Sequence, residues 1–311
     1  MTSGKGFILP PLLGEGRRDA WQSDRDSPAA VVHAFADARF AGNPAAIVLY
    51  DEFPVFTDCL QLAQRLRQPV TVFLRPLEET GQFEIRWFTQ NAELDLCGHG
   101  TLAAAYWLFR SGYCPSNRVS FRYGKGFLHA SLNGDTVRVA LPGINTVAAD
   151  PLEYEAVQRC MGVSVEEVRK AYDDYVVVVA SERVVLDYEP NFQKISQLDC
   201  RGVVLTALVD PGGPLREFDI VSRFFGPRIA INEDQVCVSA HCKLYPYWAR
   251  MLGRTDLRAL QASESGGVLE LSFSDGRVIV GGRAKLGSIE SRNEGTRDAD
   301  HGSAFAWKQL R

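Results

Sequence analysis

Hydrophobic and polar residues alternate with a period of two in several short stretches of the first half of the chain, which is typical of half-buried β-strands. In 83–89 (FEIRWFT), for example, every second residue from Phe83 to Trp87 is apolar. Strands are predicted at 30–35, 45–50, 71–76 and 83–89. Because a Gly, Asn and Pro turn at 39–44 joins the first two, we expect them to pair antiparallel. The stretch 59–67 has the apolar spacing of a helix.

The pattern changes sharply at 96–100, where LCGHG leads into TLAAAYWLFRSG (101–112). This second stretch is apolar almost all round, so it predicts a buried helix rather than an amphipathic one. Gly112 is a plausible stop for that helix. A β-meander is predicted at 119–143, with Asn133 and Gly134 as a hairpin turn.

The second half of the chain repeats this plan. Strands are predicted at 175–180, 183–188, 202–209, 217–225 and 266–282, and helices at 163–172, 191–198 and 243–253. A second cysteine-containing turn, EDQVCVSAHC (233–242), precedes the last helix, as LCGHG precedes the first buried one. Each half therefore has strands, a cysteine turn, a buried helix and a meander.

These patterns predict an α+β protein with two similar lobes, since a parallel βαβ fold would need helices that alternate regularly with strands. We place the boundary near residues 142–150. The expected division is a flexible arm at 1–28, lobes at 29–145 and 146–291, and a polar tail at 292–311.

Composition narrows the possible partners. The chain has 311 residues, of which 46% are hydrophobic and 23% charged, and its formal net charge is −4. This balance argues against a protein held on nucleic acid mainly by phosphate contacts. No apolar run approaches the roughly 20 residues that cross a bilayer, and residues 1–30 lack the unbroken apolar stretch of a signal peptide. We expect a cytoplasmic protein that binds neither nucleic acid nor membrane.

Motifs for cofactors are also missing from the sequence. There is no GxGxxG or P-loop pattern, and no cluster of His, Cys and Asp has metal-ligand spacing. We expect no nucleotide cofactor and no metal. Seven scattered cysteines, an odd number, indicate reduced and mostly buried thiols rather than a disulfide scaffold. They are Cys59, Cys97, Cys114, Cys160, Cys200, Cys237 and Cys242.

Four stretches, at 33–49, 85–105, 221–225 and 233–253, resemble the PhzF-like isomerases, in the order expected for that family. The resemblance extends from about residue 30 to 291. It implies the diaminopimelate-epimerase fold, with two pseudo-symmetric lobes that each wrap a β-barrel-like sheet around a central helix. It also implies a small-molecule substrate bound in a cleft between the lobes, no cofactor, and a homodimer.

The chain departs from the family pattern at its general base. Family members that isomerise the phenazine precursor use a Glu in a stretch resembling S-E-T-x-F. Aligned on Thr71 and Phe73, the position of this Glu holds Val70 and the preceding Ser is Pro69. Because valine cannot carry a proton, we do not expect isomerisation by the usual Glu.

A second departure lies in 233–242, where the family reads close to EDPVTGSAHC. Gln235, Cys237 and Val238 replace a Pro, a Thr and a Gly. If that Gly uses a positive φ, the β-branched Val238 does not fit comfortably, and the local backbone site for anions changes shape.

Cys97 and Cys237 correspond in position to the two thiols of the related diaminopimelate epimerases and proline racemases. There the cysteines precede the two central helices and act as a base and an acid on opposite faces of the substrate α-carbon. A helix N-terminus favours a thiolate, and one thiolate can remove a proton while the other thiol delivers one. We expect Cys97 and Cys237 to be proton carriers.

Neighbouring residues of the two turns complete the candidate site. His99 is an auxiliary acid or base, or else a structural histidine. Asp234 matches an acidic residue that lines the family's cleft, or else caps a turn. Ser239 stands where an N-cap hydroxyl belongs and is a candidate substrate contact. Further substrate-binding candidates are Gly98 and Gly100, whose backbones allow close approach, and Val70 and Val238.

Three functions remain open from the sequence. The first is a cofactor-independent isomerase or epimerase that moves a proton on a small carboxylate-bearing or cyclic metabolite, in secondary or amino-acid metabolism. The second is a cyclase or pericyclase that holds its substrate in a reactive conformation, which the apolar Val70 and Val238 would suit. The third is a catalytically inactive binding protein, since the usual base is absent.

Overall fold

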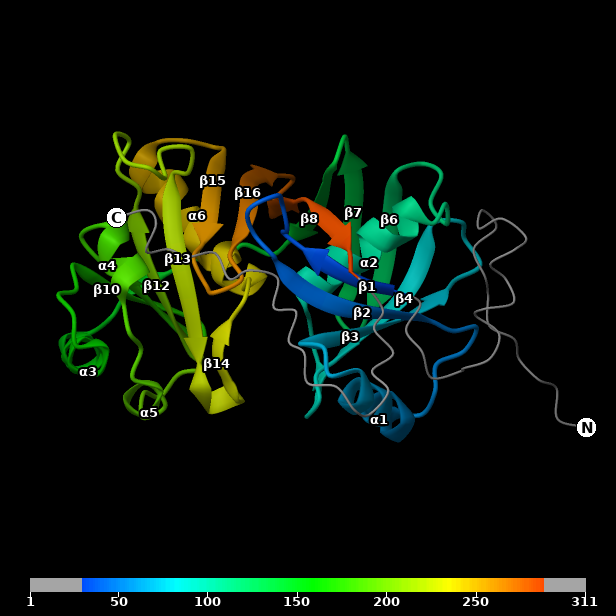
Figure 1. Ribbon diagram of the computed structural model, residues 1–311, viewed down its shortest axis with the longest axis horizontal. Helices are drawn as coiled ribbons and strands as arrows, with labels where there is room; N and C mark the ends of the chain where they lie inside the picture. Colours follow the sequence, from blue (N-terminus) through cyan, green and yellow to red (C-terminus); the bar gives the residue numbers. More distant parts are fainter. Residues whose placement is uncertain (1–29, 288–311) are drawn as a thin grey trace, which may run out of the picture. The chain divides into compact units, whose positions relative to one another are not determined.

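The structure is a computed structural model and describes residues 30–287, so the predicted arm at 1–28 and the tail at 292–311 lie outside the described residues (Figure 1). The chain forms two compact units. Among the described residues, the first unit contains 30–34, 43–140 and 282–287, and the second contains 35–42 and 141–281.

The two units are therefore interleaved and not two contiguous segments. The segment 35–42 belongs to the second unit because its backbone bonds there: Val268 donates to the carbonyl of Phe35 at 3.2 Å, and Ala41 donates to that of Ser265 at 2.9 Å. Phe40 is 1% exposed within the core of that unit. Residues 284–286 return to the first unit, where they pair with 32–34.

The first unit is a curled sheet with strand order β18-β1-β2-β3-β4-β6-β7-β8, and β5 pairs with the far end of β4. The strands are β1 (Ala30–Ala34), β2 (Asn43–Leu49), β3 (Val70–Pro76), β4 (Gln82–Phe88), β5 (Glu93–Leu94), β6 (Arg118–Tyr123), β7 (Gly126–Asn133), β8 (Thr136–Leu141) and β18 (Ala284–Leu286). The pairs β2/β3 and β4/β6 are parallel, and the other pairs are antiparallel.

The second unit has the same order, β9-β10-β11-β12-β13-β15-β16-β17, with β14 on the far end of β13. Its strands are β9 (Val147–Ala148), β10 (Glu167–Ala171), β11 (Asp174–Val178), β12 (Gly202–Leu208), β13 (Ile220–Gly226), β14 (Ile231–Asp234), β15 (Leu257–Gln261), β16 (Gly267–Ser274) and β17 (Arg277–Gly282). Again two pairs are parallel, β11/β12 and β13/β15, at the equivalent places.

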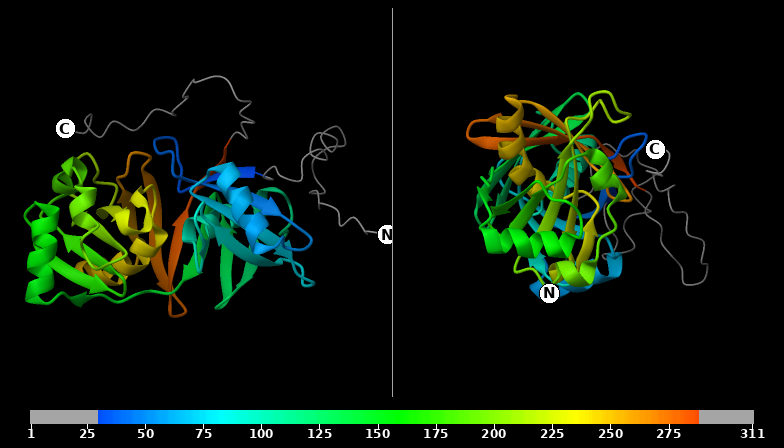
Figure 2. Two further views of the ribbon diagram at one scale, coloured as in Figure 1. Left: turned by 90° about the horizontal axis from the view of Figure 1, so that it is seen from below. Right: turned by 90° about the vertical axis from the view of Figure 1, so that its left-hand side faces the viewer.

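One buried helix occupies the inside of each sheet. In the first unit α2 (Gly98–Arg110) packs against β1, β2, β3, β7 and β18. In the second unit α6 (Val238–Leu252) lies among strands of its own unit, as Figures 1 and 2 show in yellow. Trp248 of α6 donates to Thr206 of β12 at 3.1 Å, and Tyr247 donates to Glu167 of β10 at 2.7 Å. The predicted fold, an α+β protein of two pseudo-symmetric lobes around central helices, is confirmed.

Further helices cover the outer faces of the sheets. The helix α1 (Phe56–Leu66) connects β2 to β3 and buries Cys59, Leu62 and Ala63 against Phe73 and Phe88. The remaining helices are α3 (Pro151–Met161), α4 (Glu182–Asp187), α5 (Phe192–Ile195) and the short 3₁₀ helix η2 (Pro227–Ile229). Of these, α4 and α5 connect β11 to β12 and so take the place that α1 has in the first unit.

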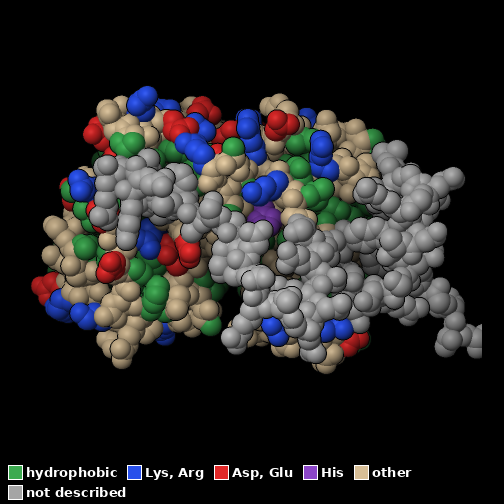
Figure 3. Space-filling model, in the orientation of Figure 1, with side chains coloured by type: hydrophobic (Ala, Val, Ile, Leu, Met, Phe, Trp, Pro, Cys, Tyr) green, Lys and Arg blue, Asp and Glu red, His purple; other side chains and the backbone are tan. Residues whose placement is uncertain are grey.

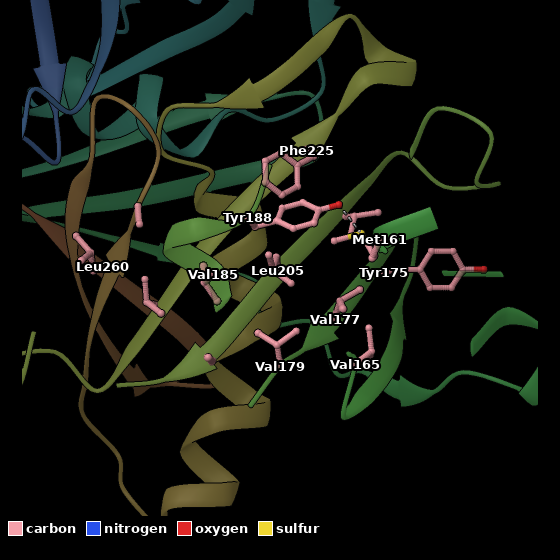
Figure 4. Packing of buried hydrophobic residues seen from close by; sticks show 14 of the residues in the cluster. Met161, Val165, Tyr175, Val177, Val179, Val185, Tyr188, Leu205, Phe225 and Leu260 are labelled. Carbon is pink, nitrogen blue, oxygen red and sulfur yellow. Dashed lines mark hydrogen bonds between the residues drawn. The ribbon is translucent and has the colours of Figure 1, made fainter. Parts of the chain in front are cut away.

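The outer core of the second unit gathers side chains from these helices and from the sheet (Figure 4). Tyr188 stacks at a tilt on Phe225, with ring centroids 5.5 Å apart, and its hydroxyl lies 3.5 Å from the sulfur of Met161. At the surface, acidic and basic side chains lie intermixed on the face drawn in Figure 3. Arg258 and Glu217 form an ion pair at 2.8 Å.

The internal repeat extends to side chains. Arg86 of β4 forms a bidentate pair with Glu93 of β5, at 2.7 and 2.8 Å. At the equivalent place in the second unit, Arg223 pairs with Glu233 at 2.7 and 2.9 Å. Each guanidinium also lies 5.0 Å from the ring of the phenylalanine two residues later in its strand. The two units therefore share a detailed structural plan.

Two predicted elements in the second half are wrong. The helix predicted at 163–172 is instead loop and strand β10, because this segment pairs antiparallel with β11 on one side and with β9 on the other. The helix lies just before it, at α3, where Asp150 and Glu153 form a capping box and Gly162 ends it at φ 67°.

The strand predicted at 183–188 is the helix α4. Its β-branched residues favour a strand locally, but α4 packs on the faces of β12 and β13, so tertiary packing overrides that preference. The strand β15 and the helix α3 were not predicted. The helix α6 also starts earlier than expected, at Val238 instead of residue 243.

Gly202 provides a test of packing in the second unit. A Cβ at this position would lie 2.3 Å from Cζ of the buried Phe224 and 2.9 Å from the carbonyl oxygen of Phe225. We expect Gly202→Ala to lower the free energy of unfolding by roughly 1–3 kcal/mol, the usual cost of overpacking. Gly124→Ala is the control, because nothing lies within 4 Å of its Cβ position. Urea denaturation of both variants measures the difference, and equal stabilities would contradict the packing argument.

Candidate active site

Cys97 is the N-cap of α2, in extended conformation at φ −135° and ψ 108°. Its carbonyl accepts hydrogen bonds from the backbone of Thr101 at 3.0 Å and from the Thr101 hydroxyl at 2.7 Å, which fixes the first helical turn. The thiol does not cap the helix. Instead, Sγ lies 3.5 Å from Nδ1 of His99, two residues along the chain.

His99 is half-buried, and its Nε2 is a buried atom that has no hydrogen-bond partner among the residues that the structure describes. Burial lowers the pKa of His99 to about 4. The ring is therefore neutral near pH 7, with one nitrogen beside the Cys97 sulfur and the other available to a ligand. A neutral imidazole in this position can accept or pass on a proton.

Gly100 and Val70 meet where α2 packs on β3. A Cβ at Gly100 would lie 3.0 Å from Val72, 3.1 Å from Trp87 and 3.2 Å from Val70. Val70 is 0% exposed. Gly100 thus allows close packing of helix on sheet, and Val70, expected to contact substrate, fills the space in front of it. Gly98, the first residue of α2, is half-buried.

Cys237 is the equivalent N-cap of α6, at φ −93° and ψ 99°. Its N–H donates to Oε1 of Gln261 at 2.7 Å, and the amide of Gln261 donates to the carbonyl of Asp234 at 2.6 Å. Nδ1 of the fully buried His241 lies 2.8 Å from the Cys237 carbonyl, in the role that Thr101 has in the first unit. The Cys237 sulfur lies 3.4 Å from the hydroxyl of Ser239. Both thiols therefore face a polar side chain two residues along the helix.

The structure also gives the positions of three other predicted site residues in the second unit, Asp234, Val238 and Ser239. The Asp234 carboxylate accepts from the N–H of Val236 at 3.2 Å, which is the turn-forming alternative. Val238 is the first helical residue and is not among the residues with positive φ, so the anticipated strain does not arise. Ser239 is not the N-cap, since Cys237 holds that position, and its hydroxyl is turned toward the thiol.

Burial controls the protonation of the thiol in the second unit. It raises the pKa of Cys237 to about 12, the nearby Asp234 carboxylate pushes the pKa in the same direction, and Arg201 opposes both. In the free protein Cys237 is thus a neutral thiol near pH 7. Burial also raises the pKa of Cys242 to about 12. All seven cysteines are free.

Several polar residues around Cys237 were missed by the sequence reasoning. Gln261 is fully buried on β15, and a lone Gln in that apolar run was the available signal. Arg201 precedes β12 and donates to Ser239 at 3.1 Å, and it also bonds Asp174, at 3.0 Å through Nε. Lys243 is buried in α6 and pairs with Asp174 and, at 2.9 Å, with Asp173. Lys243 interrupts an apolar helix, and this was the signal for a buried ion cluster.

Metal and membrane features are described only for residues 30–287. Within that range no group of three or more His, Cys, Asp or Glu side chains is arranged to hold a metal ion. None of the helices in the same range is both long and apolar enough to span a bilayer.

Comparison with known proteins agrees with this duplicated fold. The chain belongs to the phenazine biosynthesis-like (PhzC-PhzF) family, whose model matches residues 32–287. It is 37% identical over 256 residues to an uncharacterized isomerase of Pseudomonas aeruginosa, a match that covers 82% of this chain and 94% of that protein. The protein is thus a member of the phenazine biosynthesis-like family, whose curated relatives include proteins named as isomerases.

Solved structures show the same relationship. A PhzF-family phenazine biosynthesis protein of Enterococcus faecalis is similar with a TM-score of 0.75 and 33% identity, covering 84% of this chain and 97% of that one. A probable proline racemase of Agrobacterium radiobacter shares the fold at 12% identity, with a TM-score of 0.55 and coverage of 85% of this chain and 92% of that one.

His241 makes the stability of the protein depend on pH. Burial lowers its pKa to about 4 in the folded state, whereas an unfolded histidine takes up a proton near pH 6.5. Between these values the unfolded chain binds more protons, so the free energy of unfolding falls as the pH drops from about 6.5 to 4.

We expect His241→Gln to remove part of this acid sensitivity, up to roughly 1.4 kcal/mol per pH unit within the window. Urea denaturation across the pH range measures the slope. The control is His129→Gln, a substitution of an exposed histidine on β7. Identical slopes for the wild type and His241→Gln would show that His241 does not carry the effect.

Proposed function

We propose that the protein is an isomerase or epimerase that moves a proton on a small carboxylate-bearing or cyclic metabolite, with Cys97 and Cys237 as the proton carriers. The observation that carries the proposal is the repeated helix start. In each unit a cysteine is the N-cap of the central helix, and its sulfur lies within 3.5 Å of a polar side chain two residues later. Chance placement of two cysteines would not reproduce the cap, the contact and the order of strands together.

The first amides of a helix have no partner within the helix, and the helix dipole makes this end electropositive. A substrate carboxylate, or the enolate formed when a neighbouring carbon loses its proton, is stabilised by such groups. The amides at Gly98 and Gly100 in the first unit and at Ser239 in the second are the proposed donors. This supports an acidic substrate without identifying it.

The proposed chemistry needs a base and an acid. The base removes a proton from carbon, and the electron pair remains on the substrate as an enolate or carbanion. A thiol then gives its proton to carbon, and its sulfur keeps the electron pair. Cys237, whose pKa is raised to about 12 by burial, begins as the donor. Cys97 begins as the base, because its sulfur lies at the start of α2, where a helix N-terminus favours a thiolate.

The cyclase alternative depends on apolar side chains that line the substrate. Val70 is 0% exposed and lies 3.2 Å from where a Cβ on Gly100 would be, so this side chain is used in the packing of α2 on β3. This leaves proton transfer as the function that the described residues support best.

Solvent exchange tests the proposed function. The wild type is incubated in D2O with a panel of amino acids, imino acids and cyclic diene carboxylates, and deuterium on carbon is measured by mass spectrometry. We expect incorporation with at least one compound, and a fall of about 100-fold or more in Cys97→Ser and Cys237→Ser, since positioned acids and bases contribute at least that factor.

Cys160→Ser is the matched control, because Cys160 lies within α3, is half-buried and does not cap a helix. It should retain the wild-type rate. Full activity in both Cys97→Ser and Cys237→Ser would show that the thiols are not the proton carriers. Absence of deuterium during turnover of a compound would favour the cyclase, and absence of turnover of the whole panel would favour an inactive binding protein.

A further inference from the structure

The two helix starts have the same backbone plan but different charge. In the parallel pairs, Val70 of β3 stands opposite Ala45 of β2, and Gly202 of β12 stands opposite Asp174 of β11. Arg201 therefore corresponds to Pro69, and Asp174 to Ala45. Counted from the N-cap cysteines, Lys243 corresponds to Ala103. Three ionisable residues in the second unit thus stand where the first unit has Pro69, Ala45 and Ala103.

These three residues and Asp173 form a neutral cluster of two cations and two anions. Asp174 is 1% exposed and Lys243 is 1% exposed, so both charges are buried, which is costly unless the charges are paired and hydrogen-bonded. Asp174 accepts from Arg201 through both carboxylate oxygens and also from Lys243. The cluster satisfies its own charges and holds the guanidinium of Arg201 in one orientation.

In this orientation the guanidinium of Arg201 connects to the Cys237 thiol through the hydroxyl of Ser239. Nη2 of Arg201 donates to the hydroxyl of Ser239 at 3.1 Å, and that hydroxyl lies 3.4 Å from the sulfur of Cys237. Because the Ser239 oxygen accepts from Arg201, its own proton is available for the sulfur. A cation and a hydroxyl donor are arranged in line behind Cys237, and both interact more favourably with a thiolate than with a thiol.

We propose that Arg201 is a positioning residue that acts through Ser239 to stabilise the Cys237 thiolate. This inference rests on the proposed function, in which Cys237 becomes a thiolate after it gives its proton to the substrate. Arg201 then stabilises the Cys237 thiolate. The first unit has no such cation, because Pro69 stands at the position equivalent to Arg201. The sulfur of Cys97 lies instead beside Nδ1 of His99, at 3.5 Å.

Other groups near Cys237 also affect the balance between its thiol and its thiolate. Asp234 at the end of β14 and Asp174 on β11 both disfavour a thiolate, and burial disfavours it most. Cys242 and Lys243 lie on the same helix, and His241 is neutral because burial lowers its pKa to about 4. Arg201 and the Ser239 hydroxyl are the groups that favour the thiolate, so their removal should be measurable against this background.

Alkylation by iodoacetamide tests the proposal without a substrate. The reagent reacts with thiolates, so between pH 7 and 9 the rate at Cys237 is proportional to its small thiolate fraction. Peptide-resolved mass spectrometry compares Cys237 with Cys242, which is also buried on α6 and therefore reports changes in access. We expect the Cys237-to-Cys242 rate ratio to fall about tenfold in Arg201→Gln, which corresponds to one pKa unit.

Two further variants separate the charge from the fold. Ser239→Ala leaves the ion cluster intact and should lower the ratio in the same direction. Arg201→Lys keeps a cation and should fall between the wild type and Arg201→Gln. Arg223→Gln is the matched control, because Arg223 also forms a buried ion pair on a neighbouring strand but does not contact Ser239, and it should leave the ratio unchanged.

An unchanged ratio in both Arg201→Gln and Ser239→Ala would overturn the role of Arg201, and so would equal ratios in Arg201→Lys and Arg201→Gln. A lowered ratio in a protein that exchanges no solvent hydrogen would contradict the proposed function and leave the Arg201 contact established. Solvent exchange with an unchanged ratio would contradict Arg201 alone.

Discussion

The burial of one helix inside a curled sheet is the constraint on which each unit depends. A helix leaves its first amides without partners, and buried polar groups need hydrogen bonds. In neither unit does the N-cap side chain accept from these amides; instead, a side chain of the first turn contacts the N-cap carbonyl. Thr101 does so for Cys97 and His241 for Cys237. With the cap carbonyl held in this way, the thiol itself is left to face residue i+2.

The two units have different residues at the helix start. In the first unit Gly100 of the helix packs against Val70 of the strand. In the second unit Ala240 stands at the equivalent position of the helix, and Gly202 of the strand packs against Phe224 of the neighbouring strand. A repeated backbone therefore carries two different chemical environments, an apolar one with a histidine and a charged one with an arginine.

The first unit, whose helix start is apolar, also lacks a carboxylate at position 70, which holds Val70. Where the family resemblance places a general base, the chain has a packed aliphatic side chain, and the ionisable residues instead surround the other helix start. In the proposed function, proton transfer depends on the two N-cap thiols and on the side chains beside them. Those side chains differ between the units, with His99 beside Cys97 and with Ser239 and Arg201 beside Cys237.

The amino-acid sequence by itself determined the class of fold, the two lobes, the two central helices and the pair of equivalent cysteines, because these depend on local periodicity and on long matching motifs. It did not determine that 163–172 is a strand and 183–188 a helix, since partner strands and packing faces outweigh local preference there. Only the tertiary structure decided that residues 35–42 join the second unit, that Val70 is consumed in packing, and that Arg201, Asp174, Ser239 and Lys243 meet behind Cys237. Residues up to 69 positions apart in the chain form that cluster, and no pattern within a segment specifies a charge pairing between segments.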